Sequence, residues 1–295
     1  MCLDACFGIA HPQRHPVPSP TLPYLTITLV ALFAAGLTFF SGFGLGTLLL
    51  PAFALFMPVE VAIGATAMVH LANNLYKVAL MARHADRGIT AIFAGFSVIG
   101  ALAGAWLLTL LADGHTLHTY TLSSRSFEVT MIGLVIGVMM ITFAILELTP
   151  ATSKWGLPRN LLWMGGLLSG FFGGLSGHQG ALRSAFLVRT DMSKDALVGT
   201  RAVCAVAVDT TRLLVYVVAA LLTARAVSPT DQARDTLRTL HEHNAWALIA
   251  TGCVAALIGT NIGKRLLKEV TIDAVRTTVA IALLVLGIAL ALGLV

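Results

Sequence analysis

Long apolar runs separated by short polar stretches dominate the chain after residue 23. A helix needs about 20 mostly apolar residues to cross a bilayer, and most of the runs approach or exceed that length. Leu45–Phe56 and Gly180–Val188 are too short to cross alone, and each follows a glycine-rich stretch that ends the preceding run. The pattern predicts about eight spanning segments, with two broken or re-entrant helices. The runs are Tyr24–Phe40, Leu45–Phe56, Val59–Ala82, Ile89–Ala112, Phe127–Leu148, Asn160–Leu175, Gly180–Val188, Ala196–Thr223, Asn244–Arg265 and Ile272–Val295.

The composition agrees with a chain that is dissolved in lipid. Hydrophobic residues make up 57% of the 295 residues and charged residues only 11%, whereas a soluble domain carries roughly 25% charged residues. Only helices and closed barrels satisfy their backbone groups inside a bilayer. Barrel strands alternate apolar and polar residues over about 10 positions, and these runs do not alternate. The sequence therefore predicts an all-α, polytopic membrane helix bundle.

The first 23 residues contain prolines and no long apolar run, so we expect a flexible N-terminal tail over residues 1–23. The tail lacks the order of a signal peptide, in which a charged stretch precedes an apolar one. Residues 24–295 are predicted to form one transmembrane domain. Its two longest polar stretches, His115–Ser126 and Arg225–His243, are expected to be loops.

The two halves of the chain repeat weakly. A shift of 134 positions, obtained as 170 − 36, places Gly36 on Gly170, Gly46 on Gly180 and Thr66 on Thr200. Each half also has the same order of elements: a segment, a glycine-rich break, a short apolar piece, a long helix with polar residues and two further helices. The predicted repeats are residues 24–148 and 159–295. Repeats with broken helices in matching positions are typical of secondary transporters, whose site lies between the breaks.

The charges of the loops predict an orientation. If each short piece leaves on the side from which its broken segment entered, nine basic residues lie on one side and five on the other, including Arg14 in the tail. The positive-inside rule then places the nine in the cytoplasm, both termini outside and the halves in inverted orientation. The nine are Arg83, Arg87, Lys154, Arg159, Arg189, Lys194, Lys264, Arg265 and Lys268, and the outer loops hold Arg125, Arg225, Arg234 and Arg238.

Glycines spaced four apart mark helix faces that let two backbones approach closely. We interpret these glycines as packing positions. The pairs are Gly100 and Gly104, Gly133 and Gly137, Gly166 and Gly170, and Gly259 and Gly263.

A polar stripe runs along the predicted helix after Pro58. Its members are separated by three or four residues and share one face, while the other face is aliphatic. On a spanning helix such a stripe faces either other helices or a water-filled cavity, and we favour the cavity. The last member, Lys77, can alternatively snorkel to the inner interface. The stripe consists of Thr66, His70, Asn73, Asn74 and Lys77.

Glycine breaks precede both short pieces. In the first break Gly42, Gly44 and Gly46 alternate with other residues, which permits close approach of the backbone. The free N–H groups of the following half-helix favour an anion. The spacing is G-x-G-x-G and no βαβ unit surrounds it, so it is not a dinucleotide-binding fingerprint.

The second half carries the charged candidates. His178 and Gln179 lie in its break beside Gly180, and Arg183 follows at a depth where an unpaired charge costs at least several kcal/mol. Arg183 either binds an anion through its planar fork or pairs with an acid or with helix-end carbonyls. On the next helix Arg201, Asp209 and Arg212 share one side, and the i, i+3 spacing predicts an Asp209–Arg212 pair. The remaining positive charge favours an anionic substrate, and Asp209 or a histidine is a candidate for proton coupling.

No cofactor and no metal site is predicted. The four cysteines, Cys2, Cys6, Cys204 and Cys253, form no CxxC pair. The net charge of +5 comes from residues scattered over short loops, so we predict no nucleic-acid partner. The chain also lacks HExxH, and no serine has a clear base, so we do not expect an enzyme. Its expected partners are a small anionic solute and the lipid bilayer.

The chain resembles the TauE/SafE family, the sulfite exporters or anion permeases of bacterial membranes. The resemblance rests on the first glycine break with Pro51, on Gly64-Ala65-Thr66 and on the run 174–184 with its flanks over 170–216. It covers nearly the whole chain after residue 24. It implies transport of sulfite, sulfonates or similar anions across the bacterial inner membrane. Leu45, His178, Gln179 and Ala185 depart from the family pattern, which concerns the substrate more than the fold.

Three functions compete: a secondary transporter of a small anion, a membrane-embedded enzyme, and a passive anion channel or structural subunit. The first is the predicted function. Its candidate substrate-binding residues are Gly42, Gly44, Gly46, Thr66, His70, Asn73, Asn74, His178, Gln179, Gly180, Arg183, Thr200, Arg201, Asp209 and Arg212.

Overall fold

A computed structural model describes residues 21–41, 45–112, 116–122, 125–149, 159–187, 190–226, 244–266 and 272–294. Residues 1–20 of the predicted tail, Gly42 and Gly44 lie outside these ranges. The first helix begins at Thr21, three positions before the predicted start of the membrane domain. The predicted loop at Arg225–His243 also falls mostly outside the described residues.

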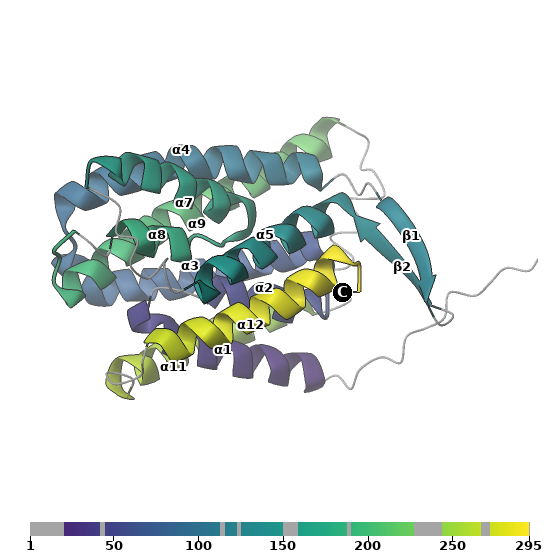
Figure 1. Cartoon of the computed structure of the whole chain (residues 1–295), viewed down its shortest axis with the longest axis horizontal. Helices are drawn as coiled ribbons and strands as arrows, with labels where there is room; N and C mark the ends of the chain where they lie inside the picture. The colour runs from purple at the N-terminus through teal and green to yellow at the C-terminus, as the bar shows by residue number, and fades with distance from the viewer. Residues whose placement is uncertain are drawn as a thin grey trace, which may run out of the picture.

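The described residues are mainly helical (Figure 1). The apolar runs become helices at close to their predicted limits, and the two short runs become the short helices α2 and α8. The helices are α1 (Thr21–Ser41), α2 (Leu45–Ala54), α3 (Val59–Met81), α4 (Arg87–Leu111), α5 (Met131–Leu148), α7 (Leu162–Ser176), α8 (Gly180–Leu187), α9 (Lys194–Ala226), α11 (Ala245–Leu266) and α12 (Ile272–Ala291), with the 3₁₀ turns η1 (Ala82–His84) and η2 (Arg159–Leu161).

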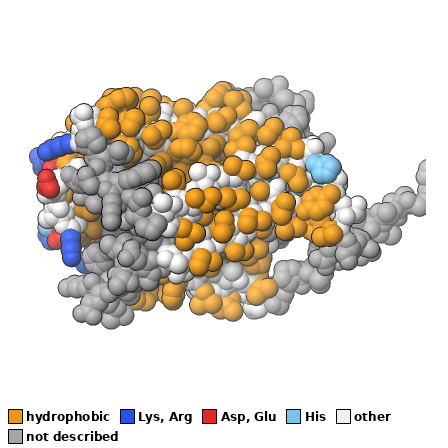
Figure 2. All heavy atoms as spheres, in the orientation of Figure 1, with side chains coloured by type: hydrophobic (Ala, Val, Ile, Leu, Met, Phe, Trp, Pro, Cys, Tyr) orange, Lys and Arg blue, Asp and Glu red, His pale blue; other side chains and the backbone are white. Residues whose placement is uncertain are grey.

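Five of the described helices are long and apolar enough to cross a membrane, namely α1, α4, α5, α9 and α11. Large hydrophobic side chains remain exposed along their outer faces: Phe33 is 66% exposed and Leu214 is 60% exposed. Figure 2 shows hydrophobic side chains over most of the visible surface, with charged side chains gathered at one end. Exposed apolar surface on this scale requires lipid as its solvent. The helix bundle is therefore that of a multi-pass membrane protein, as predicted.

The stretch predicted as a loop at His115–Ser126 is instead largely an antiparallel hairpin, and the prediction was wrong there. Strand β1 (Thr116–Leu122) pairs with β2 (Arg125–Thr130), with Tyr120 opposite Phe127. Threonines and aromatic residues favour strands, and the aromatic cross-strand pair stacks at 5.4 Å between ring centroids. The Tyr120 hydroxyl donates to the Leu292 carbonyl oxygen at 2.7 Å, which fastens the hairpin to the end of α12.

Small residues bring three pairs of helices into contact, as the glycine spacing predicted. Helix α4 packs on α7, α11 on α1, and α12 on α5. A Cβ added at Gly100 would lie 2.1 Å from the Leu167 carbonyl oxygen, and one added at Gly263 would lie 2.3 Å from the Gly36 carbonyl oxygen. Gly137 meets Gly287 in the same way. These backbones are too close to admit any side chain at the contact.

Helices α1 and α7 end inside the bundle, and α2 and α8 start there. Gly177 ends α7 with a φ of +87°, a left-handed conformation that favours glycine. Most residues of α2 are buried, and Pro51 lies within it. Helices α3 and α9 pack against each other beside these breaks. The interruptions thus lie among the other helices, where irregular backbone is tolerated in a membrane protein.

The two ends of the bundle differ. The β-hairpin and the end of α12 lie at one end, while the links from α3 to α4 and from α8 to α9 lie at the other (Figure 1). Figure 2 shows lysine, arginine and acidic side chains at this second end.

The glycine contact between α4 and α7 generates a test of the packing. A Cβ at Gly104 would meet the Phe171 carbonyl oxygen at 2.0 Å, so Gly104→Ala must push the helices apart. We expect it to cost about 1–3 kcal/mol of stability. Gly95 lies on the same helix with nothing within 4 Å of an added Cβ, so Gly95→Ala should be neutral or gain up to about 1 kcal/mol. Thermal unfolding in detergent compares the two, and equal melting temperatures would contradict this packing.

Candidate functional site

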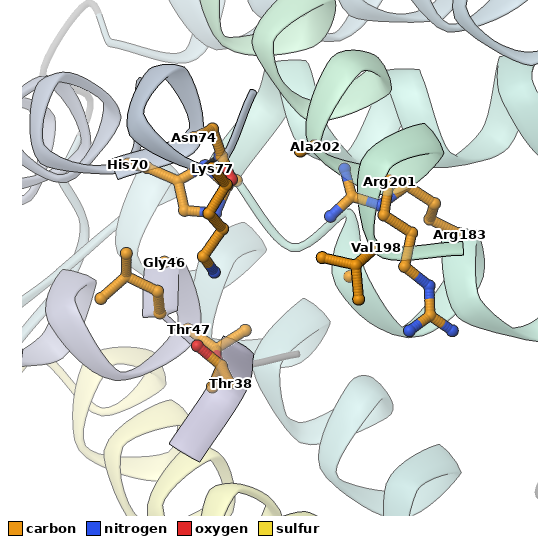
Figure 3. Close-up of a pocket in the computed structure, with 13 residues that line it drawn as sticks. Thr38, Gly46, Thr47, His70, Asn74, Lys77, Arg183, Val198, Arg201 and Ala202 are labelled. Atoms are coloured by element: carbon orange, nitrogen blue, oxygen red, sulfur yellow. Dashed lines mark hydrogen bonds between the residues drawn. The ribbon is translucent and has the colours of Figure 1, made fainter. Parts of the chain in front are cut away.

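Polar side chains gather in one pocket where the two helix breaks meet α3 and α9. The pocket has a volume of about 30 Å³, which is room for about two water molecules. Both halves of the chain contribute to it, and Figure 3 shows them on opposite sides. The lining residues are Thr38, Leu45, Gly46, Thr47, His70, Asn74, Lys77, Gly177, Gly180, Arg183, Val198, Arg201 and Ala202.

The first half supplies the start of α2 and one face of α3. Gly46 and Thr47 lie in the first turn of α2, next to the break, so the positive end of that helix points at the pocket. His70, Asn74 and Lys77 come from α3 at intervals of four and three residues, which places them on one face. All three are buried, with at most 8% of the residue exposed.

The second half supplies the start of α8 and the first turns of α9. Gly180 opens α8 and Arg183 lies one turn further on. Val198 and Arg201 come from α9. The arginines are 4% and 6% exposed, so the pocket holds two buried guanidinium groups together with the ammonium group of Lys77.

The two glycine breaks approach each other directly. A Cβ added at Gly46 would lie 3.4 Å from the Gly177 carbonyl oxygen and 3.6 Å from Cδ2 of His70. The starts of α2 and α8 therefore border the same space, as the predicted facing breaks require. Gly42 and Gly44 lie outside the described residues.

Asp209 of α9 connects the two halves beside the pocket. Its Oδ2 lies 2.6 Å from Nδ1 of His70 and accepts a hydrogen bond from Nδ2 of Asn74 at 2.9 Å. Its Oδ1 accepts from Nε2 of Gln179 at 3.2 Å and lies 2.9 Å from Nη2 of Arg212. The carboxylate is fully buried. It thereby ties α3, the second break and α9 to one another.

The predicted Asp209–Arg212 pair is confirmed, and Arg212 also holds the second break. Arg212 is completely buried, and its Nη1 donates to the Gly173 carbonyl oxygen at 3.3 Å. A Cβ at Gly177 would meet this Nη1 at 2.6 Å. Neither Asp209 nor Arg212 lines the pocket. Asp209 and Arg212 instead hold α3, α9 and the second break together beside the pocket.

Arg183 lies differently from Arg212. Its Nη1 donates to Oε1 of Gln179 at 3.1 Å, and its Nε has no hydrogen-bond partner among the described residues. No carboxylate of the described chain lies within 4 Å of its guanidinium. Gln179 in turn donates to Asp209, so it connects Arg183 to the Asp209 network. Of the two possibilities for Arg183, pairing with an acid does not occur within the described residues.

Besides Gln179, Asp209 and Arg212, four further predicted site residues lie outside the pocket. Asn73 accepts from the Thr260 hydroxyl of α11 at 2.6 Å. Thr200 accepts from the Asp86 backbone N–H at 3.0 Å, and so joins α9 to the start of α4. His178 stacks on Phe143 and lies 2.8 Å from the Ser176 hydroxyl. The fourth, Thr66, is buried on α3. The contacts of the first three hold elements together, which is the interhelical alternative for such polar groups.

A sequence model of the family described as "Sulfite exporter TauE/SafE" matches residues 27–290 of the chain. The chain belongs to the TauE/SafE family. Members of this family are transporters rather than enzymes, so the helix bundle is that of a multi-pass membrane transporter for a small solute. Neither a curated protein nor a solved structure matches the chain in the corresponding comparisons.

Within this TauE/SafE chain, sequence reasoning missed three polar lining residues, Thr38, Thr47 and Lys77, as well as four apolar or glycine positions. Lys77 belongs to the polar stripe but was not selected, because a lysine near a helix end can also reach the interface. The stem and ammonium group instead stay inside, with the Nζ atom 5.8 Å from the centre of the Phe39 ring. Thr38 and Thr47 flank the first break, and their position beside the glycines is the signal that could have indicated them.

The Asp209–Arg212 pair at the TauE/SafE site can be tested by thermal unfolding. Asp209→Leu and Arg212→Met each leave one buried charge unmatched, which costs about 3–5 kcal/mol. The double variant leaves neither charge, so we expect it to lose clearly less than the sum of the two. Arg87 is exposed at the start of α4, and Arg87→Met combined with Asp209→Leu should be additive. Additivity in both combinations would contradict the pair as the source of stability.

Proposed function

We propose that this chain is a secondary transporter of a small anion, such as sulfite or a sulfonate, in the bacterial inner membrane. The observation that carries the proposal is the convergence of Arg183, Arg201 and Lys77 on one buried pocket between the two breaks. A charge at such depth is costly and marks the path of an ion or substrate in membrane proteins.

The chemistry of the lining suits an oxyanion. A guanidinium group presents a planar fork that matches the oxygens of sulfite, sulfonate or carboxylate groups. Helices α2 and α8 both begin at the pocket, and their free N–H groups and dipoles favour negative charge. Gly46 and Gly180 leave the backbone at these helix starts open to close approach. Arg183, Arg201, Gly46 and Gly180 are thus the proposed substrate contacts, with His70 and Asn74 beside them.

The reciprocal packing of the helices supports our proposal that residues 24–148 and 159–295 are inverted repeats. Under the shift of 134 positions α1 corresponds to α7, and the order of elements pairs α4 with α11. Helix α4 packs on α7, and its counterpart α11 packs on α1. Helices α3 and α9, and likewise α5 and α12, pack on their own counterparts. This exchange of neighbours is what a pseudo-two-fold axis produces, and it supports the predicted architecture of about eight spans.

An apolar cluster beside the pocket favours a carrier over the alternative, a passive anion channel. Phe39, Met81 and Val198 pack together from α1, α3 and α9, and each is at most 8% exposed. Phe39 follows the lining residue Thr38, Met81 lies one turn beyond Lys77, and Val198 lines the pocket itself. A carrier needs such a barrier next to its site, which must open and close during each cycle.

The proposed orientation places the end with Arg83 and Arg87 in the cytoplasm and the β-hairpin outside. Single cysteines test it in a variant whose four native cysteines are replaced by alanine. We expect Ser126→Cys on β2 to react with a membrane-impermeant maleimide in intact cells, and Arg83→Cys to react only after lysis. Any other labelling pattern would refute this topology.

Arg183→Gln tests the site. Loss of a buried charge that contacts the anion costs about 2 kcal/mol or more, which corresponds to at least about a thirtyfold loss of binding. We expect that loss in thermal-shift titrations with sulfite, sulfate, thiosulfate and sulfoacetate, and a matching loss of flux into proteoliposomes. The substitution removes a buried charge that has no carboxylate partner within the described ranges, so the melting temperature of the empty protein should not fall.

The matched control is Arg87→Gln, which changes an exposed arginine at the start of α4 and should retain binding and flux. Normal transport by well-folded Arg183→Gln protein would rule out the site. Flux that saturates with substrate supports the carrier, whereas ion conductance without saturation would favour the channel.

A further inference from the structure

Lys77 adds a positive charge to the pocket from the side opposite the arginines. It lies on α3 in the first half, only 8% of the residue is exposed, and it lines the pocket. The arginines come from α8 and α9 in the second half, and Figure 3 shows them across the pocket from Lys77. Within the described ranges, no carboxylate lies within 4 Å of the Lys77 ammonium group.

The charged neighbours of Lys77 do not neutralise it. Arg183 and Arg201 line the same pocket as Lys77, so their like charges repel that of Lys77 rather than match it. The nearby carboxylate of Asp209 is already matched by Arg212 and by hydrogen bonds from His70, Asn74 and Gln179. The groups that face the pocket together with Lys77 are Thr38 from α1, Thr47 from α2, His70 and Asn74 from α3, Arg183 from α8, and Val198 and Arg201 from α9.

Two buried cations, Arg183 and Lys77, therefore face one small space from opposite sides, and neither has a carboxylate partner in the part of the chain that the structure describes. A solute with a single negative charge would match one of them and leave the other uncompensated at a depth where that is costly. A solute with two negative charges would match both.

We infer that the site is built for a compact, doubly charged oxyanion, and that Lys77 is the residue that selects the charge of the substrate. This inference rests on the proposed function and narrows it. Arg183 supplies a planar fork that recognises an XO₃ group of either charge. Lys77 supplies a compact point charge that responds to the total charge of the solute rather than to its shape. The pocket is small, about 30 Å³, so an extended ion would require a larger opening of the site than a compact one.

Sulfate and methanesulfonate provide a matched pair of probes. Both are tetrahedral about sulfur, and a methyl group in methanesulfonate replaces one oxygen, so the charge falls from two to one with little change of shape. Dissociation constants of both ions are measured by calorimetry on the purified full chain in detergent. The proteins compared are the wild type, Lys77→Met, Lys77→Arg and Lys264→Met. Lys264 is exposed near the end of α11 and away from the pocket.

For the wild type we expect sulfate to bind on the order of 10- to 100-fold more tightly than methanesulfonate. Lys77→Met should remove most of that preference by weakening sulfate, while methanesulfonate binding changes by less than about threefold. Lys77→Arg keeps the charge and should keep the preference, and Lys264→Met should leave both constants unchanged. A structural role for Lys77, such as packing on Phe39, would shift both ions together and leave their ratio intact.

Different results would refute the role of Lys77 and the proposed anion site. If both ions bind the wild type equally, or if Lys77→Met leaves their ratio unchanged, the role of Lys77 is overturned while anion binding stands. If neither ion binds the wild type, or if Arg183→Gln binds both as the wild type does, the proposed anion site falls and the inference with it.

Discussion

The structure depends on how charges are matched inside a medium that cannot solvate them. Asp209 meets this constraint by accepting from His70 and Asn74 of one half and by pairing with Arg212 of the other. One carboxylate thereby fixes α3 against α9 and, through Arg212 and Gly173, fixes the end of α7 as well. This junction adds to the glycine contacts in holding the two breaks opposite each other, because lipid supplies no hydrophobic force between helices.

The presence or absence of a carboxylate partner separates two kinds of buried arginine among the described residues. Arg212 has a carboxylate at 2.9 Å and a carbonyl oxygen as partners, so it belongs to the scaffold. Among the described residues, Arg183 donates to the side-chain oxygen of Gln179, which is neutral. A guanidinium with neutral partners keeps its attraction for an incoming anion, whereas one that is already matched does not. The scaffold and the site are therefore distinguished by their counterions rather than by residue type.

The sequence predicted the helices, the glycine contacts and the Asp209–Arg212 pair because each depends on local spacing. The polar stripe on α3 was only partly informative. His70 and Asn74 reach the pocket, but Asn73 turns to Thr260 of α11, since a step of 100° moves it to the next interface. The depth of Lys77 and the hairpin pairing of Tyr120 with Phe127 depend on neighbours that are distant in sequence or across a turn. The periodicity of apolar residues along the sequence contains no information about such contacts.

Helix α3 brings its five polar side chains into the bilayer, and it is not among the helices that are apolar enough to cross by themselves. During synthesis it reaches the membrane before α9, which carries the acceptor for His70 and Asn74. Its stable insertion must therefore wait for the second half, or be assisted by the insertion machinery until α9 arrives. The feature that builds the pocket thus also leaves the polar side chains of α3 without their partner in lipid until α9 has been synthesised.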